Sequence, residues 1–210
     1  MTTWVENPRG GRERGPRGLA RAWVEVLVRP RNFFRVGVAP GDQAPGLAFA
    51  VVVALAYVAV LFAVEPARIP DLGAGSAGSA LIALLAVALL IAPAVLHLVA
   101  AVQTLLLIVL DVLLGAAGID LPDRGGVSET VQVLAYAAAP CVFASLPVTE
   151  VRVVATLYGA ALLVVGVAEI HRAGPLRALV AAAIPAALVF GYAFGGFAAL
   201  GELLAAWTIV

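Results

Sequence analysis

Long apolar blocks constrain this chain more than any other feature of its sequence. The first block, residues 47–64, runs without a single charged side chain. As a helix it covers about 27 Å at about 1.5 Å per residue, close to the thickness of bilayer hydrocarbon. The chain is 63% hydrophobic and only 12% charged, a composition that a water-soluble fold cannot bury. We therefore predict an all-α membrane protein, a five-helix transmembrane bundle preceded by a short amphipathic interfacial helix.

The other spans follow from the remaining apolar blocks. The predicted spans are residues 47–64, 80–114, 129–146, 151–168 and 179–197, and a short apolar tail, residues 198–210, is too short to cross again. Residues 80–114 exceed the length of one span, and two interpretations are open. They form either one long helix kinked at Pro93 or two spans joined near His97. No Gly, Asn or Asp lies between Ala80 and Leu110, which favours one helix.

The N-terminal part is polar and is predicted to lie along the inner leaflet. Residues 1–16 combine Gly, Pro and Arg and predict a disordered basic tail. In residues 17–37, apolar side chains at helical spacing predict an amphipathic interfacial helix whose pattern ends at Pro30. Aromatic rings suit the headgroup layer, and guanidinium groups reach its phosphates. The residues assigned to this membrane interface are Trp23, Leu27, Arg29, Pro30, Arg31, Phe33, Phe34 and Arg35.

Arginine positions predict the orientation. Eight of the thirteen arginines precede the first span, and Arg172 and Arg177 follow the fourth, whereas Arg68 and Arg152 stand alone in the opposite loops. Positive charge accumulates in cytoplasmic loops, so we expect a cytoplasmic N-terminus and a C-terminus outside the cell membrane. On a membrane domain, anionic lipid headgroups explain the basic segment more simply than nucleic acid, and no nucleic-acid partner is expected.

Polar residues inside the second span form the main candidate for function. His97, Thr104 and Asp111 are seven residues apart and are predicted to share one helix face, with Gln103 beside them. Such residues are costly in lipid and should face protein. We interpret the stripe as contacts between helices or with another subunit, either a second copy or another membrane protein. The alternative is a small transporter or channel that uses the stripe as a path.

Catalytic motifs are not found in the sequence. It contains no Gly-x-Ser-x-Gly, His-Glu-x-x-His or phosphate-binding loop. Its single cysteine, Cys141, lies in an apolar block, which excludes an internal disulfide or a cysteine-based metal site. We therefore expect a protein that is not an enzyme and uses no cofactor.

Three motifs follow one another along the chain. The first is Trp23-x-x-x-Leu27-x-x-Pro30-x-x-Phe33-Phe34, and the second is Tyr136-x-x-x-Pro140 followed by Pro147. The third extends from Tyr158 through Gly166 to Arg177. Together they resemble the Yip domain family, the Ypt/Rab-interacting-protein-like polytopic membrane proteins, in a prokaryotic form, although the family usually has Trp at the position of Tyr158. The resemblance implies a five-span bundle with a cytoplasmic N-terminus. Eukaryotic relatives bind Rab-type GTPases, but prokaryotic relatives mostly lack an assigned function, so this role is not transferred.

Together these observations predict a non-enzymatic multi-pass membrane protein that organises lipid or recruits partners. The sequence names neither the specific partner nor a transported species.

Overall fold

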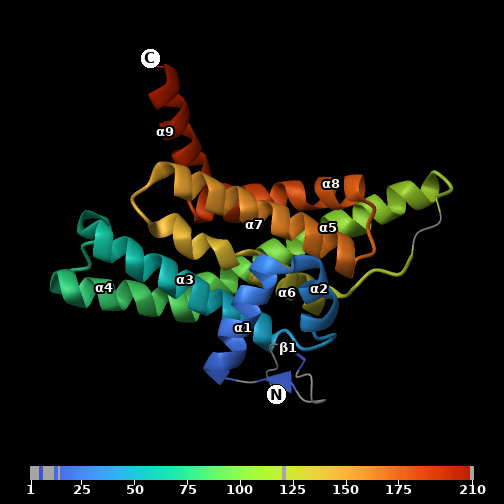
Figure 1. Ribbon diagram of the computed structural model, residues 1–210, viewed down its shortest axis with the longest axis horizontal. Helices are drawn as coiled ribbons and strands as arrows, with labels where there is room; N and C mark the ends of the chain where they lie inside the picture. Colours follow the sequence, from blue (N-terminus) through green and yellow to red (C-terminus); the bar gives the residue numbers. More distant parts are fainter. Residues whose placement is uncertain (1–4, 7–11, 14, 120–121, 209–210) are drawn as a thin grey trace.

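The computed structural model describes residues 5–6, 12–13, 15–119 and 122–208 (Figure 1). The disorder predicted for residues 1–16 therefore concerns a segment that lies mostly outside the described residues. In chain order the elements are the paired antiparallel strands β1 (Val5–Glu6) and β2 (Arg12–Glu13), then α1 (Gly15–Val28), α2 (Pro30–Gly37), α3 (Ala44–Val64), the 3-10 helix η1 (Pro66–Arg68), α4 (Gly75–Ala86), the π-helix η2 (Val87–Ile91), α5 (Ala92–Ala116), α6 (Val127–Ala137), the 3-10 helix η3 (Ala139–Ser145), α7 (Thr149–Ile170), α8 (Pro175–Ala186), the π-helix η4 (Ala187–Ala193) and α9 (Gly196–Thr208).

The predicted all-α membrane bundle is confirmed. In the described part of the chain, five helical segments are long and apolar enough to cross a membrane: Ala44–Val64, Gly75–Ala116, Val127–Ser145, Thr149–Ile170 and Pro175–Ala193. Each begins a few residues before the predicted span, because the first turn uses residues that precede the apolar block. Pro45 and Pro175 lie in such first turns, where the missing N–H has no intrahelical partner to lose.

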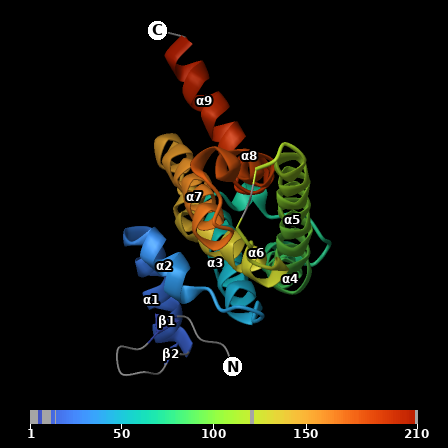
Figure 2. The same cartoon turned by 90° about the vertical axis from the view of Figure 1, so that its right-hand side faces the viewer.

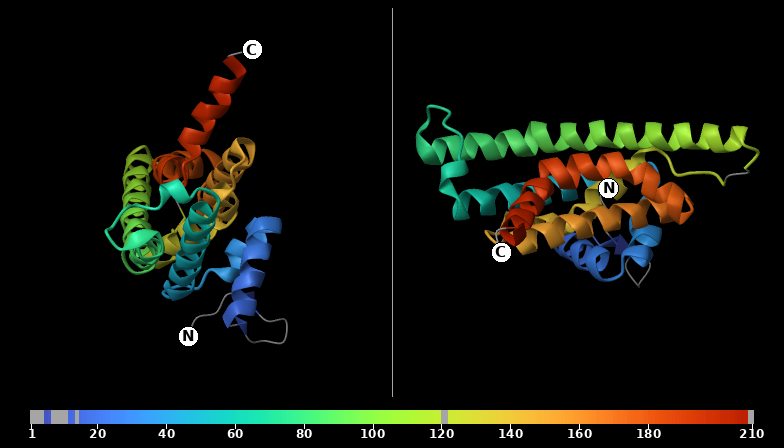
Figure 3. Two further views of the ribbon diagram at one scale, coloured as in Figure 1. Left: turned by 90° about the vertical axis from the view of Figure 1, so that its left-hand side faces the viewer. Right: turned by 90° about the horizontal axis from the view of Figure 1, so that it is seen from above.

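The second span is one continuous helix made of α4, η2 and α5 (Figure 3). Its 42 residues correspond to about 63 Å, roughly twice the hydrocarbon thickness. The π turn lies directly before Pro93, which has no N–H for the carbonyl of Leu89. The helix continues through this π turn and ends only at Ala116.

The short helix α6 and η3 form the centre of the bundle. Every residue from Thr130 to Cys141 is buried. Helices α3, α5 and α7 surround α6, and α1 reaches it from one side (Figure 2). Four alanines, Ala135 and Ala137–Ala139, keep this centre narrow enough for its neighbours to approach closely.

The segment predicted as one interfacial helix, residues 17–37, is divided into α1 and α2 by Arg29, which precedes Pro30 and is not helical. We call these two helices the head. The head lies on one side of the bundle, and α1 runs across the direction of the spans (Figures 1 and 2). At the other end of the chain, Gly195 takes a left-handed conformation, φ 73°, and α9 turns away from the bundle after it (Figure 1).

We name the two ends of the bundle by what lies there. The head end contains the segments that join α5 to α6 and α7 to α8. The tail end contains η1, the turn between η3 and α7, and the start of α9.

Candidate functional site

Four aromatic rings fasten the head to the centre of the bundle. Tyr136 on α6 packs edge-on against Phe33, with ring centroids 4.8 Å apart, and against Phe49 of α3 at 5.0 Å. Phe33 in turn contacts Phe34, and both are buried. The sequence prediction placed Phe33 and Phe34 in the headgroup layer, and the structure places them in the protein core instead. Full burial against protein removes more apolar area from water than a position at the membrane surface does.

Two hydrogen bonds hold α1 against the bundle. The indole Nε1 of Trp23 donates to the carbonyl of Ala139, at 2.8 Å, and its ring contacts Phe143. The hydroxyl of Tyr158 on α7 donates to the carbonyl of Leu27. Trp23 and Leu27 are half-buried, so these two residues also face the bundle in part.

An ion pair and a backbone clamp fix the end of the head. Arg35 donates to Glu169 near the end of α7 at 2.7 Å, and Arg31 lies 3.8 Å from the same carboxylate. Beyond α2, the amide side chain of Gln132 bonds both the N–H and the carbonyl of Ala39, at 2.9 and 2.7 Å. Sequence reasoning missed Gln132, although an amide inside an apolar span is itself a signal that a polar partner is near.

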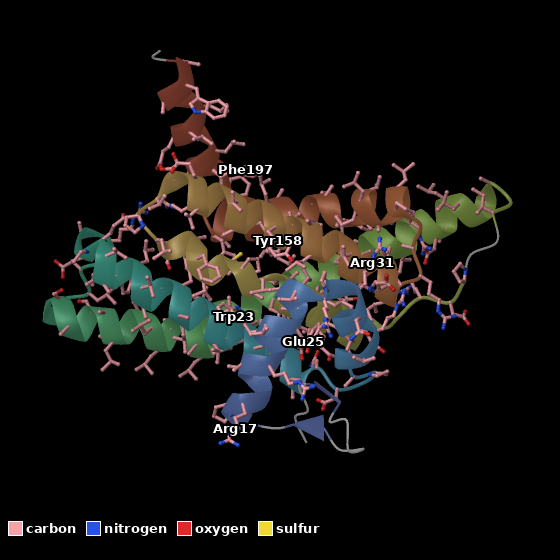
Figure 4. The ribbon with its side chains drawn as sticks, in the orientation of Figure 1. Arg17, Trp23, Glu25, Arg31, Tyr158 and Phe197 are labelled. Carbon is pink, nitrogen blue, oxygen red and sulfur yellow. The ribbon has the colours of Figure 1, made fainter. Side chains whose placement is uncertain are left out.

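The outer surface of the head is apolar and basic. Val24 is 53% exposed and Val28 69% exposed, one helical turn apart. Arg29, Arg31 and Arg35 are exposed, whereas Pro30 is half-buried. Arg17 lies at the end of α1 that points away from the bundle, and Arg31 lies on the side of α7 (Figure 4). Of the predicted interface residues, the three arginines are thus the exposed ones, and two of them, Arg31 and Arg35, also contact Glu169.

A second cluster joins three segments at the head end. Asp111 of α5 pairs with Arg177 of α8, and its other oxygen lies 3.4 Å from Nε of Arg124. The Arg177 side chain is only 8% exposed. His171 is buried beside this cluster, and its Nε2 lies 3.3 Å from the hydroxyl of Thr130. Burial, and secondly the nearby guanidinium of Arg124, lower the pKa of His171 to about 4.

The predicted polar stripe does not keep to one face. His97 is exposed, and its Nδ1 bonds the carbonyl of Pro93 within its own helix, at 2.7 Å. Gln103 and Thr104 are buried, and Gln103 donates to the carbonyl of Ala181 on α8, at 2.8 Å. Asp111 belongs to the ion-pair cluster. The four residues therefore do not line a common path in the part of the chain that the structure describes.

The residues of the family-like motifs lie in different places. Tyr136 and Pro140 are buried in the centre, and the Tyr136 hydroxyl has no partner among the described residues. Pro147 is exposed in the turn before α7, and Arg177 belongs to the ion-pair cluster. In the described ranges no three His, Cys, Asp or Glu side chains come together in a group that could hold a metal ion.

A comparison with family models agrees with this architecture. The model of the Yip1 domain matches residues 24–197, from the head to the last span. No curated protein and no solved structure matches the chain. Since the matched region includes the end of α1, α2, the central helix and all five spans, the chain belongs to the Yip1 domain family.

Proposed function

We propose that this protein is a non-enzymatic multi-pass protein of the cell membrane, which organises lipid or recruits partners through its head. The N-terminus is cytoplasmic and the C-terminus is outside, as the arginine distribution favours. The head then faces the inner leaflet, whose anionic lipids attract basic segments.

The observation that carries this proposal is the way the head is mounted. Its aromatic residues contact the bundle, so the head is a fixed part of the domain. What it still presents is a pair of exposed valines, Val24 and Val28, together with exposed arginines. An apolar strip with guanidinium groups beside it suits the membrane interface, where the strip can contact acyl chains and the guanidinium groups can contact anionic headgroups.

The polar groups inside the bundle support a structural role rather than catalysis. Asp111 is paired with two guanidinium groups. His171 is buried, and its lowered pKa keeps the imidazole uncharged at neutral pH. Contacts within the protein account for both groups.

The transporter alternative rests on one observation. Oε1 of Gln103 and Oγ1 of Thr104 are buried without a partner among the described residues. Such atoms could contact a passing ion, but the lipid-facing position of His97 interrupts the path. Flux through proteoliposomes that is abolished by Asp111→Asn would favour this alternative.

The head can be tested with a single fluorescent reporter. Cys141 is buried, so a new cysteine at Val28 can be labelled selectively with an environment-sensitive dye. In nanodiscs, we expect the dye at Val28→Cys to report an apolar environment when anionic lipid is present, and more weakly with zwitterionic lipid alone. The same dye at Arg172→Cys, an exposed loop position, is the control.

The outcomes separate the two forms of the proposal. Shielding by anionic lipid supports lipid organisation, and shielding only in native membranes supports a protein partner. A dye that stays in water in all three settings contradicts both.

A further inference from the structure

A buried arginine at the tail end has one guanidinium nitrogen without a hydrogen-bond partner among the described residues. Arg152, one turn into α7, is 7% exposed, and its Nε has no hydrogen-bond partner among the described residues. Its nearest carboxylate, Glu202 of α9, is 3.9 Å away and half exposed. At this distance the pair is an ion pair without a hydrogen bond. A guanidinium in a membrane protein is costly unless a better anion neutralises it.

A second polar group converges on the same place. Among the described residues, the hydroxyl of Tyr57 on α3 donates one hydrogen bond, to the carbonyl of Phe194, at the long distance of 3.5 Å. Gly195 marks the meeting point, because a Cβ there would lie 3.8 Å from the Tyr57 hydroxyl and 3.9 Å from a terminal nitrogen of Arg152. Two donors from different helices therefore face one small region beside a residue without a side chain. Donors in this arrangement suit a phosphate oxygen.

An apolar cavity begins at Tyr57 and continues toward the middle of the bundle. Its volume is about 160 Å³. Ala50, Ala54, Tyr57 and Val58 line it along one face of α3, and Leu134 of the central helix lines its inner part. Tyr57 supplies the only hydroxyl among the lining side chains, so water gains little by entering. A hydrocarbon chain suits such a cavity, whose lining residues recur at helical spacing along α3 and along the second span.

Both π-helices of the described chain line this cavity. Val87 and Ile91 come from η2, and Val189 and Ala193 come from η4. A π turn is rare and is frequently found at functional sites. Two such turns, from separate spans, at one cavity favour a binding role over a packing defect.

We propose that this is a binding site for an anionic glycerophospholipid, whose phosphate contacts Arg152 and Tyr57 and whose acyl chain enters the cavity between α3, α5 and η4. With the orientation proposed above, the lipid belongs to the outer leaflet. The site itself does not depend on that orientation. Glu202 competes with the phosphate for Arg152, because both are anions near the same guanidinium.

The competition gives a sharp test in which two variants move in opposite directions. Purified protein is equilibrated with phosphatidylglycerol, and the retained lipid is counted by native mass spectrometry. We expect Arg152→Gln to lower phosphatidylglycerol retention about tenfold, since one charge-assisted contact is lost. Glu202→Gln should raise it. A purely structural ion pair predicts that the two variants act alike, and equal loss in both, or no change in both, overturns the proposal. Arg172→Gln removes the same charge from an exposed loop and should leave retention unchanged.

A variant that fills the cavity can distinguish binding of a whole lipid from binding of a phosphate group alone. Ala54→Trp should lower phosphatidylglycerol retention, because the indole occupies the space of the acyl chain. Glycerol phosphate, which has no acyl chain, should displace the remaining lipid from this variant as well as it does from the wild type. If Ala54→Trp retains the lipid like the wild type, the acyl chain does not occupy the cavity and the proposal fails.

The wild-type protein provides a test that needs no variant. Phosphatidylglycerol with a photoreactive group in its acyl chain should attach to residues that line the cavity, such as Ala54, Val87 and Val95. Labelling confined to outward-facing residues such as Leu89 and Leu98 contradicts a lipid inside the cavity.

Discussion

Asp111 on α5 pairs with Arg177 on α8, across 66 positions of the chain, and this contact ties the long second span to the last one. The Arg177 side chain is almost fully buried, and the Asp111 side chain is 26% exposed. Arg124 approaches the same carboxylate from the segment before α6. One carboxylate therefore joins three parts of the head end.

Removing this carboxylate should destabilise the bundle. Asp111→Asn leaves the buried guanidinium of Arg177 without its anion, which we expect to cost about 2–4 kcal/mol in unfolding free energy. Unfolding by a denaturing detergent, followed by circular dichroism, measures it. Arg172→Gln should change the unfolding free energy by less than about 0.5 kcal/mol, because Arg172 is exposed. Equal stability of the Asp111 and Arg172 variants would show that the pair contributes nothing.

The Tyr136 hydroxyl has no partner among the described residues, so we expect the protein to tolerate its removal. Tyr136→Phe keeps the ring between Phe33 and Phe49 and removes a buried polar atom, so stability should stay within about 1 kcal/mol of wild type or rise. Tyr136→Ala removes the ring and should cost about 3–5 kcal/mol. The same unfolding assay compares them, and a Tyr136→Phe variant as unstable as Tyr136→Ala would point to a hydroxyl contact.

His171 should make the bundle sensitive to acid. Its pKa is about 4 in the folded protein against 6.5 for a free imidazole, so between these values the unfolded state binds the proton and the folded state does not. Above pH 6.5 this difference in proton binding does not lower the unfolding free energy. As the pH drops from 6.5 toward 4, it lowers the unfolding free energy by up to about 3 kcal/mol. His171→Gln should flatten this part of the pH dependence. An unchanged slope in the variant would assign it to other groups.

A glycine on α7 lets the head approach. A Cβ at Gly166 would lie 2.6 Å from a methyl carbon of Val133 and 3.0 Å from the ring of Phe34. Gly166→Ala should therefore loosen the head and speed trypsin cleavage after Arg31 and Arg35. Gly115→Ala is the matched control, because its added methyl group meets no atom within 4 Å. Equal cleavage rates in both variants would mean that the head is not held at this contact.

The spans could be predicted from the sequence because hydrophobic length alone decides them. Residues 47–64 and 151–168 require a bilayer whatever their neighbours are. The position of Phe33 and Phe34 could not be predicted, since an amphipathic helix looks the same whether its apolar face meets lipid or protein. That choice depends on Tyr136 and Gly166, which lie more than 100 residues away in the sequence.

Among the polar residues, too, the sequence indicated which ones are costly in a membrane but not which partners they contact. Asp111 was recognisable as a costly residue, but its partner Arg177 was assigned to a membrane face, and only the fold brings the two together. Arg152 entered the sequence argument only as a loop charge. Its burial beside Tyr57 depends on the turn at Gly195, which no local pattern of α3 or α7 indicates.

A bundle of five spans crosses the membrane an odd number of times, which places the two ends of the chain on opposite sides of the membrane. Single cysteines at Arg17 and Trp207 can be labelled with a membrane-impermeant maleimide, since Cys141 is buried and Trp207 is 70% exposed. In intact cells, Trp207→Cys should react, and Arg17→Cys should react only after permeabilisation. Reaction of both cysteines from the same side would contradict the five-span bundle.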